Sequence, residues 1–120
     1  MPKILIVDDD IQITDLIKNV LAVHGYESVS VNDSSKAFQT AISIKPNLFI
    51  LDLMMPEPNG FELCKMLRAD PNFVNTPIAI ITAMDDGDSR AIAYLAGAND
   101  YLTKPFDPED LAARIKALIN

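Results

Sequence analysis

Residues 47–56 read NLFILDLMMP, an apolar run that leads into a single carboxylate, Asp52. A continuous apolar run of this length is typical of a strand that is buried on both faces, as in a parallel sheet. Asp52 then lies where that strand leaves the sheet, at the carboxyl edge, where ligand chemistry collects in open α/β folds. An aspartate in this position is a nucleophile, a metal ligand or the cap of the next turn.

Four more short strand patterns accompany this run, and each of the five is followed by apolar residues at helical spacing. The other strands are expected at residues 4–7, 26–31, 77–82 and 100–103. The helices are expected from Ile11 to His24-Gly25, from an Asp33-Ser34 cap to Pro46, from Phe61 to Asp70-Pro71, from Asp85 to Gly97, and from Asp107 onward. The first helical stripe includes Ile11, Ile13, Leu16, Ile17, Val20 and Leu21.

This alternation predicts an α/β fold, in which a five-stranded parallel sheet is wound on both sides as (βα)5. Strand order does not follow from the alternation. At 120 residues the chain is long enough for one domain, which we place at residues 1–120, with a substantial core.

Composition excludes several classes of protein. A net charge of −7 and a pI near 4.4 argue against a nucleic-acid surface. The single cysteine, Cys64, excludes an internal disulfide and fits a reducing compartment. The apolar run after Met1 is too short for a signal peptide or a membrane span, so we expect a cytoplasmic protein with no membrane contact.

Polar side chains follow four of the expected strands. They are Asp8, Asp9, Asp52, Thr82 and Lys104. In a parallel sheet these strand ends share one edge, where clustered carboxylates repel by about 4 kcal/mol per pair at ~4 Å and an effective dielectric of ~20. A divalent cation is therefore expected, and a small set of carboxylates with water favours Mg²⁺, with Mn²⁺ as the alternative.

A carboxylate beside Mg²⁺, an ammonium group and a hydroxyl group is equipped to accept a phosphoryl group. The cations offset charge on the transferring oxygens, and the aspartate supplies the attacking atom.

Five motifs give the chain a family resemblance: Val7-Asp8-Asp9, Asp52-Leu53-Met54-Met55-Pro56, Asn59-Gly60, Thr82-Ala83 and Lys104-Pro105-Phe106. Together they resemble the receiver domain of two-component response regulators, including the chemotaxis receivers, over essentially the whole chain. The resemblance implies a flavodoxin-like strand order of 2-1-3-4-5. It also implies a cis Lys104-Pro105 peptide.

The resemblance assigns the phosphoacceptor role to Asp52. The phosphoryl group would come from a phosphohistidine on a histidine kinase or a histidine phosphotransfer protein. Asp9, Asp52 and the backbone carbonyl of Met54 would bind Mg²⁺, and Asp8 would act largely through water. The protein would then be a signalling switch that phosphorylates and dephosphorylates itself, without a separate turnover substrate.

The same resemblance assigns the response to the phosphoryl group. Thr82 would hydrogen-bond one phosphoryl oxygen, Lys104 would pair with another, and Tyr101 would repack as Thr82 moves. The responding face would span about Asp86 to Asn120 and would meet a downstream effector protein or domain. The expected kinase contacts are Ile11, Gln12, Thr14, Asp15, Pro105 and Phe106.

Some residues depart from the family pattern. Asn59 stands where the family often has aspartate, with Pro58 before it, so we expect changed loop geometry but intact chemistry. Met54 and Met84 are bulky at positions that flank the path of the attacking water in the family. We hypothesise that they slow loss of the phosphoryl group. For Met54, and for its neighbour Met55, plain packing is an equally good interpretation.

Two other functions stay open at this point. Asp8-Asp9-Asp10 also resembles the nucleophile motif of haloacid-dehalogenase-type phosphatases, with Asp8 as nucleophile and Asp10 as general acid. Gln12 replaces the usual Thr or Val of that motif, and Asp52 would have no role. The third possibility is a receiver-like interaction module that is never phosphorylated. The sequence identifies neither a kinase nor an output.

Overall fold

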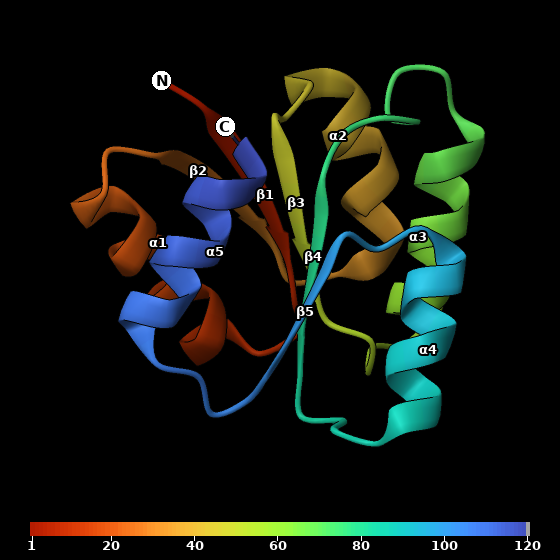
Figure 1. The fold of residues 1–120 in the computed structure, drawn as a ribbon. Helices are drawn as coiled ribbons and strands as arrows, with labels where there is room; N and C mark the ends of the chain where they lie inside the picture. Colours follow the sequence, from red (N-terminus) through yellow and green to blue (C-terminus); the bar gives the residue numbers. More distant parts are fainter. Residues whose placement is uncertain (120) are drawn as a thin grey trace.

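The computed structural model describes residues 1–119, which form a parallel sheet of five strands in the order β2-β1-β3-β4-β5 (Figure 1). The strands are β1 (Lys3–Val7), β2 (Glu27–Val31), β3 (Leu48–Leu51), β4 (Ile78–Thr82) and β5 (Asp100–Thr103). The helices are α1 (Ile11–Val23), α2 (Ala37–Ile44), α3 (Gly60–Ala69), α4 (Gly87–Ala96) and α5 (Pro108–Ile119). The α/β class is confirmed, and so is the strand order that the resemblance implied.

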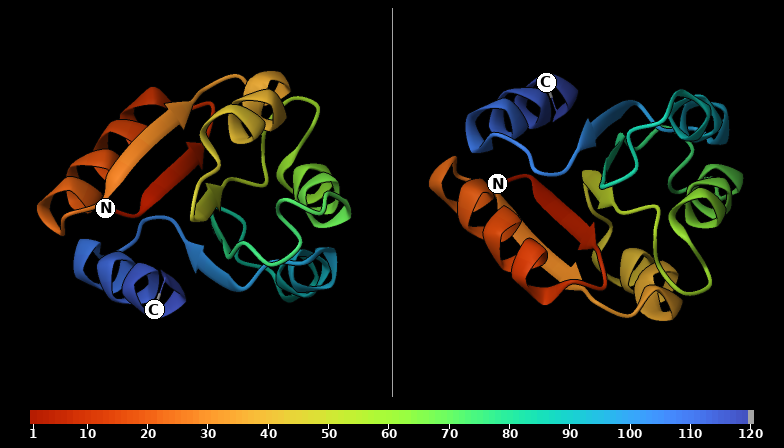
Figure 2. Two further views of the ribbon diagram at one scale, coloured as in Figure 1. Left: turned by 90° about the horizontal axis from the view of Figure 1, so that it is seen from above. Right: turned by 90° about the horizontal axis from the view of Figure 1, so that it is seen from below.

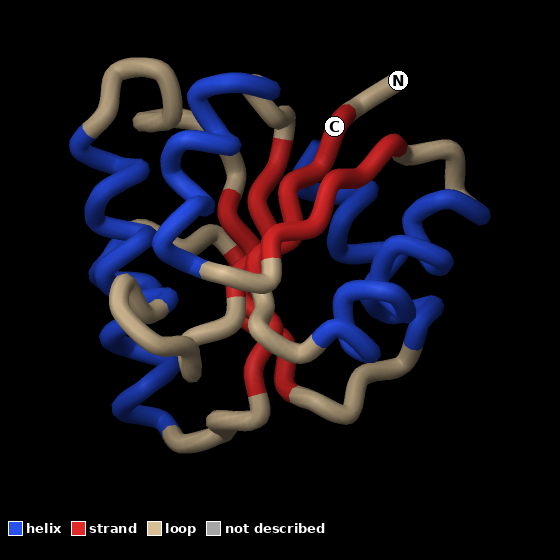
Figure 3. Tube along the Cα trace, turned by 180° about the vertical axis from the view of Figure 1, so that it is seen from behind, coloured by secondary structure: helices blue, strands red, loops and turns tan. Residues whose placement is uncertain are grey.

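Helices cover both faces of the sheet. α1 and α5 lie together on one face, and α2, α3 and α4 lie on the other. Figure 2 shows this arrangement from above and from below, and Figure 3 shows it from behind. Within residues 1–119, every helix is too short or too polar to cross a lipid bilayer.

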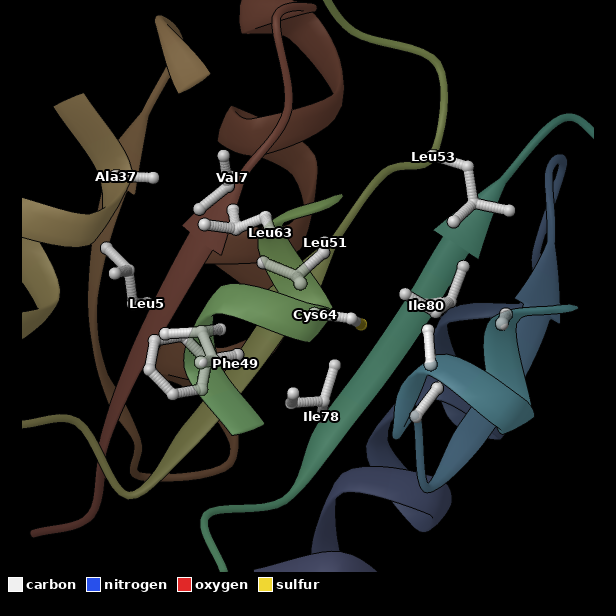
Figure 4. Packing of buried hydrophobic residues seen from close by; sticks show 14 of the residues in the cluster. Leu5, Val7, Ala37, Phe49, Leu51, Leu53, Leu63, Cys64, Ile78 and Ile80 are labelled. Carbon is white, nitrogen blue, oxygen red and sulfur yellow. The ribbon is translucent and has the colours of Figure 1, made fainter. Parts of the chain in front are cut away.

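Strand side chains alternate between two hydrophobic cores. Leu5, Phe49 and Leu51 face α2, α3 and α4, where Figure 4 shows them packed around Cys64 and Leu63. Their chain neighbours Ile4, Ile6, Leu48 and Ile50 face α1 and α5. Burial of such a side chain stabilises the fold by about 1.5–3 kcal/mol. Because all four residues of β3 are buried, the apolar run before Asp52 is confirmed as a strand covered on both faces.

Side-chain caps begin several of the helices. Asp10 accepts hydrogen bonds from the backbone N–H groups of Gln12 and Ile13 and so caps α1. Asp86 caps α4, which begins at Gly87 and not at Asp85 as expected. Asp33 caps a 3₁₀ turn over residues 34–36, so α2 begins only after that turn.

The apolar stripe of α1 was partly misassigned. Ile11 and Leu16 are exposed by 61% and 44%, although both belong to the expected helical stripe; for Ile11, exposure agrees with its expected place as a kinase contact. The buried face carries Thr14, Ile17 and Leu21, three or four residues apart. Ile11 lies in the first turn of α1 and is exposed even though its residue type suggests burial.

The strand register brings the carboxyl ends of the central strands together. Val7 of β1 pairs with Val31 of β2 and with Leu51 of β3. The next residues continue this register, because the Asp8 N–H donates to the Val31 carbonyl and the Asp52 N–H donates to the Val7 carbonyl. Asp8 and Asp52 therefore leave the sheet side by side.

Cys64 should be chemically inert in the folded protein. Its side chain is fully buried beside the sheet, and burial raises the pKa of its thiol to about 11. A thiol-reactive disulfide reagent at pH 8 should therefore label the native protein slowly and the urea-unfolded protein at once. Since the folded pKa exceeds that of a free thiol, this group's contribution to stability should be lost as the pH rises from about 9 through about 11. Rapid labelling of the native protein would contradict the buried placement.

Candidate functional site

Three carboxylates meet at the carboxyl edge of the sheet. Asp8, Asp9 and Asp52 each present an oxygen within 4.8 Å of the other two. Asp8 and Asp52 are buried, while Asp9 is exposed at the mouth of the cluster. An all-oxygen set with one open side suits a hard divalent cation that keeps several waters, as Mg²⁺ does. The structure thus brings together the three acidic residues that the sequence placed in one site.

Lys104 joins two of these carboxylates. Its Nζ lies 2.8 Å from Asp8 Oδ2 and 3.1 Å from Asp52 Oδ2. The Lys104 backbone N–H donates to the Thr82 carbonyl at 2.8 Å, which fixes the loop after β5 against β4. Burial alone would lower the pKa of Lys104, but its hydrogen bonds and charge pairing with both aspartates raise it. Lys104 is therefore a fixed cation beside Asp52.

Asp8 is a costly charge in this pocket. Burial raises the pKa of its carboxyl, and the nearby Asp52 charge raises it further, although Lys104 and the Asp10 N–H act in the opposite direction. The Lys104 ammonium group thus only partly compensates the buried carboxyl. A divalent cation would supply the remaining positive charge.

Thr82 connects this cluster to Tyr101. The Thr82 side chain is fully buried, and its Oγ1 accepts a long hydrogen bond of 3.4 Å from the Met84 N–H. The Met84 carbonyl in turn accepts a 2.7 Å hydrogen bond from the Tyr101 hydroxyl. Tyr101 is buried with its ring under the Arg90 guanidinium, whose carbon lies 4.5 Å from the ring centroid. A shift at Thr82 can therefore reach Tyr101 through one intervening residue.

The loop from β3 to α3 holds Asp52 by close backbone packing. The Gly60 N–H donates to the Leu53 carbonyl, and a Cβ at Gly60 would lie 2.2 Å from the Asp52 carbonyl oxygen. Asn59 begins α3 through a reciprocal capping box with Glu62. The Glu57-Pro58 peptide in this loop is cis, and the expected cis Lys104-Pro105 peptide is present.

Met54 and Met84 line one surface groove of about 500 Å³ beside the acidic cluster. Asp9 also lines this groove, and Met54 is 59% exposed. The Met54 N–H donates to Asp52 Oδ1 at 3.2 Å. Both methionines thus border the groove that reaches Asp9 of the acidic cluster.

Asn32 is a site residue that the sequence analysis missed. Its amide donates to the Asp8 carbonyl at 2.9 Å and to Thr14 Oγ1 at 3.2 Å. The amide thereby ties the end of β2 to the acidic turn. Its position directly after an expected strand was the only available signal, and that signal is weak.

The expected kinase contacts are mostly accessible. Ile11, Gln12, Asp15 and Pro105 are exposed, and Phe106 is partly exposed. Thr14 is the exception, because only 1% of it is accessible and its hydroxyl is used by the Ile11 carbonyl and the Asn32 amide. The expectation that its side chain contacts a partner is therefore wrong.

Comparison with known proteins gives one consistent match. Residues 4–116 match the family model described as the response regulator receiver domain. The chain is 40% identical over 119 residues to the DNA-binding dual master transcriptional regulator RpaA of Synechocystis, covering 99% of this chain and 49% of that protein. It is 39% identical over 116 residues to the phosphate regulon transcriptional regulatory protein PhoB of Pseudomonas aeruginosa, covering 97% and 51%. The chain thus spans about half the length of these relatives.

Solved structures agree with the sequence matches. A putative response regulator from Chloroflexus aurantiacus superposes with a TM-score of 0.94 at 36% identity, covering 98% of this chain and 97% of that one. The beryllofluoride-activated receiver domain of RstA from Klebsiella pneumoniae superposes with a TM-score of 0.92 at 30% identity, covering 98% of both chains.

Proposed function

The chain belongs to the response regulator receiver domains, and from this membership we propose that Asp52 is its phosphoacceptor. Receiver domains of two-component response regulators are phosphorylation-dependent signalling switches. The observation that carries the assignment to Asp52 is its position: it is buried in the acidic cluster, 3.1 Å from the Lys104 ammonium group. A carboxylate oxygen there can attack a phosphoryl group whose charge is balanced by the surrounding cations.

The metal would be held by Asp9, Asp52 and the Met54 carbonyl, with Asp8 acting through water. Bound Mg²⁺, or Mn²⁺ in its place, would supply charge to the transferring oxygens. The residues support this role because, within residues 1–119, three carboxylates converge and the Lys104 ammonium group is the one cation paired with them. Lys104 would turn from the carboxylates toward a phosphoryl oxygen once the group has been transferred.

The proposed readout runs from Thr82 to the face formed by α4, β5 and α5. Thr82 would hydrogen-bond a phosphoryl oxygen and give up its bond to the Met84 N–H, which is already long. Because Met84 also holds the Tyr101 hydroxyl, the change would pass into β5 and the start of α4. The expected boundary of this face at Asn120 lies outside the described residues.

The acidic turn argues against the phosphatase alternative. Asp10 already has a structural role, because its Oδ1 accepts hydrogen bonds from two N–H groups at the start of α1. Asp10 is therefore assigned to capping. Asp52, which that alternative leaves without a role, lies beside Lys104 at the centre of the cluster.

The proposal also covers partners and location. A histidine kinase or a histidine phosphotransfer protein would supply the phosphoryl group and would dock at Ile11, Gln12, Asp15, Pro105 and Phe106. A downstream effector protein or domain would recognise the responding face. The chain spans about half the length of its curated relatives, so the DNA binding named for RpaA is not assigned to it. We place the domain in the cytoplasm, where an unpaired thiol such as Cys64 persists.

Incubation with acetyl phosphate tests this function. With Mg²⁺ present, intact-mass measurement should show one phosphoryl adduct. The adduct should be absent when a chelator removes Mg²⁺, because the acidic cluster is then short of positive charge. Absence of any adduct with Mg²⁺ and with Mn²⁺ would instead favour the unphosphorylated interaction module.

Met54→Asn should accelerate loss of the phosphoryl group. Met54 borders the groove beside Asp52, and an amide there can orient an attacking water that a thioether cannot hold. We expect the dephosphorylation rate to rise by about tenfold, the scale of a single well-placed hydrogen bond of about 1–1.5 kcal/mol. Decay of the adduct can be followed by intact mass after the phosphodonor is removed.

Met66→Asn is the matched control for this change. Met66 is 41% exposed on α3 and does not line the groove. Its replacement should leave the dephosphorylation rate unchanged. Equal rates in the wild type and in Met54→Asn would mean that Met54 serves only packing.

A further inference from the structure

Arg68 ties together two loops that are distant in the sequence. Its guanidinium donates to the Phe73 and Thr76 carbonyls at 2.7 Å, in the loop between α3 and β4. It also donates twice to the Gly97 carbonyl, at 2.9 and 3.0 Å, and once to Asn99 Oδ1 at 2.8 Å, in the loop between α4 and β5. All these acceptors are carbonyl oxygens, so the charged group serves as a multidentate clamp on backbone and amide groups.

The second of these loops, between α4 and β5, begins at the C-terminal end of α4. Gly97 ends this helix in the left-handed conformation, with φ of 118°, and lies so close to Arg68 that a Cβ would be 2.5 Å from Arg68 Cγ. Asn99 continues the attachment, because its N–H donates to the Ile78 carbonyl and its Oδ1 accepts from the Ile78 N–H. This end of α4 is therefore bound to both α3 and β4, and Figure 1 shows α4 lying alongside α3.

The N-terminal end of α4 is attached in a different way. The residues before it connect to the acidic cluster through Thr82, Met84 and Tyr101, with one bond of 3.4 Å and one of 2.7 Å. Arg90, in the first turns of α4, lies over the Tyr101 ring. These are the contacts that the proposed readout changes, whereas the Arg68 contacts lie at the opposite end of the helix.

We propose that Arg68 is a positioning residue that fixes the C-terminal end of α4, so that α4 pivots near Gly97 when Asp52 is phosphorylated. This inference rests on the proposed function, and it identifies the end of α4 that stays fixed when the other end moves. A guanidinium clamp on two loops holds that end through several charge-assisted hydrogen bonds, while the opposite end depends on contacts that Thr82 can release. Within α4, movement is therefore largest at the start of the helix and smallest near Gly97.

Amide hydrogen exchange with Mg²⁺ and beryllofluoride, a stable mimic of the phosphoryl group, tests the pivot. In the full wild-type chain, addition of both should change exchange over residues 83–90 and leave residues 97–99 unchanged. In Arg68→Lys, which keeps the charge but loses the planar fork, exchange at residues 97–99 should rise by about tenfold, because hydrogen bonds to a charged group are lost. The beryllofluoride-induced change should then spread from residues 83–90 to residues 97–99.

Lys65→Gln is the matched control, since Lys65 is an exposed basic residue on the same helix, and it should behave as the wild type. The pivot is refuted if the wild type already changes at residues 97–99 as strongly as at residues 83–90, and this comparison requires no variant. It is also refuted if Arg68→Lys raises exchange at residues 97–99 but keeps the beryllofluoride response confined, since that is the result of a merely structural role. No response anywhere in the wild type would instead refute the proposed function, and the pivot with it.

Discussion

Asp52→Asn is expected to abolish the phosphoryl adduct. The substitution replaces the attacking carboxylate oxygen with a neutral amide and removes a proposed metal ligand, so both requirements for transfer are lost. The amide nearly matches the carboxylate in size, and the fold should persist because the β3 register and the buried core around it do not depend on the charge. Intact mass after incubation with acetyl phosphate and Mg²⁺ should show an adduct below about 1% of the wild-type level, since loss of a nucleophile costs several orders of magnitude in rate.

Asp15→Asn is the control for this prediction. Asp15 lies exposed on α1, away from the acidic cluster, and its replacement makes the same change of charge. Its adduct should form at the wild-type level with acetyl phosphate, which bypasses the partner kinase. An adduct of wild-type yield in Asp52→Asn would transfer the phosphoacceptor role to another residue.

Gly60→Ala is expected to have the largest effect among the glycine-to-alanine substitutions at Gly25, Gly60 and Gly87. The added Cβ would lie 2.2 Å from the Asp52 carbonyl oxygen and 2.7 Å from Leu53 Cα, and both are backbone atoms that cannot rotate away. The loop must therefore shift and carry Asp52 with it. Because overpacking typically costs about 1–3 kcal/mol, we expect urea denaturation to show a loss in this range or above it. The yield of the phosphoryl adduct should fall as well.

Gly87→Ala separates this steric effect from the general effect of adding a methyl group. A Cβ at Gly87 would meet no atom within 4 Å, and alanine is the better helix former at the start of α4. Its free energy of unfolding should stay the same or rise slightly. If both variants unfold at the same urea concentration, the close approach of Gly60 to Asp52 does not position the loop.

The residues of the site were predictable from sequence because each one ends a strand. Apolar runs define the strands, and the alternation with helices implies a parallel sheet, so Asp8, Asp9 and Asp52 had to reach the same edge. Lys104 and Thr82 follow by the same reasoning. The ion pairs that Lys104 makes with Asp8 and Asp52 could not be predicted, because they depend on side-chain conformations that residue spacing does not determine.

The rotation of α1 was only partly predictable. The periodic pattern included Ile11, which is exposed, and omitted Thr14, which is buried. Hydrophobicity alone assigns isoleucine to the core, whereas the structure buries Thr14 because Asn32 and the Ile11 carbonyl satisfy its hydroxyl. Those partners lie on another element or depend on the local backbone, so the pattern of residue types within α1 does not reveal them.

The role of Arg68 could not be predicted from the sequence. In the sequence it is one basic residue near the end of a helix, where cations are common. Its acceptors at Phe73, Thr76, Gly97 and Asn99 lie in two loops that the fold brings together. Only the packing of α3 against α4 makes it a clamp, so the fold class alone could not have identified it.

Mapping the phosphoryl group to a single residue tests the central claim most directly. Borohydride reduces an aspartyl phosphate to homoserine, so the treated protein can be digested and the modified residue located by mass spectrometry. If the carboxylates converge into a metal-dependent acceptor centred on Asp52, homoserine should appear at position 52 and only when Mg²⁺ was present. Homoserine at position 8 would contradict this account and would identify the turn after β1, and not the end of β3, as the reacting centre.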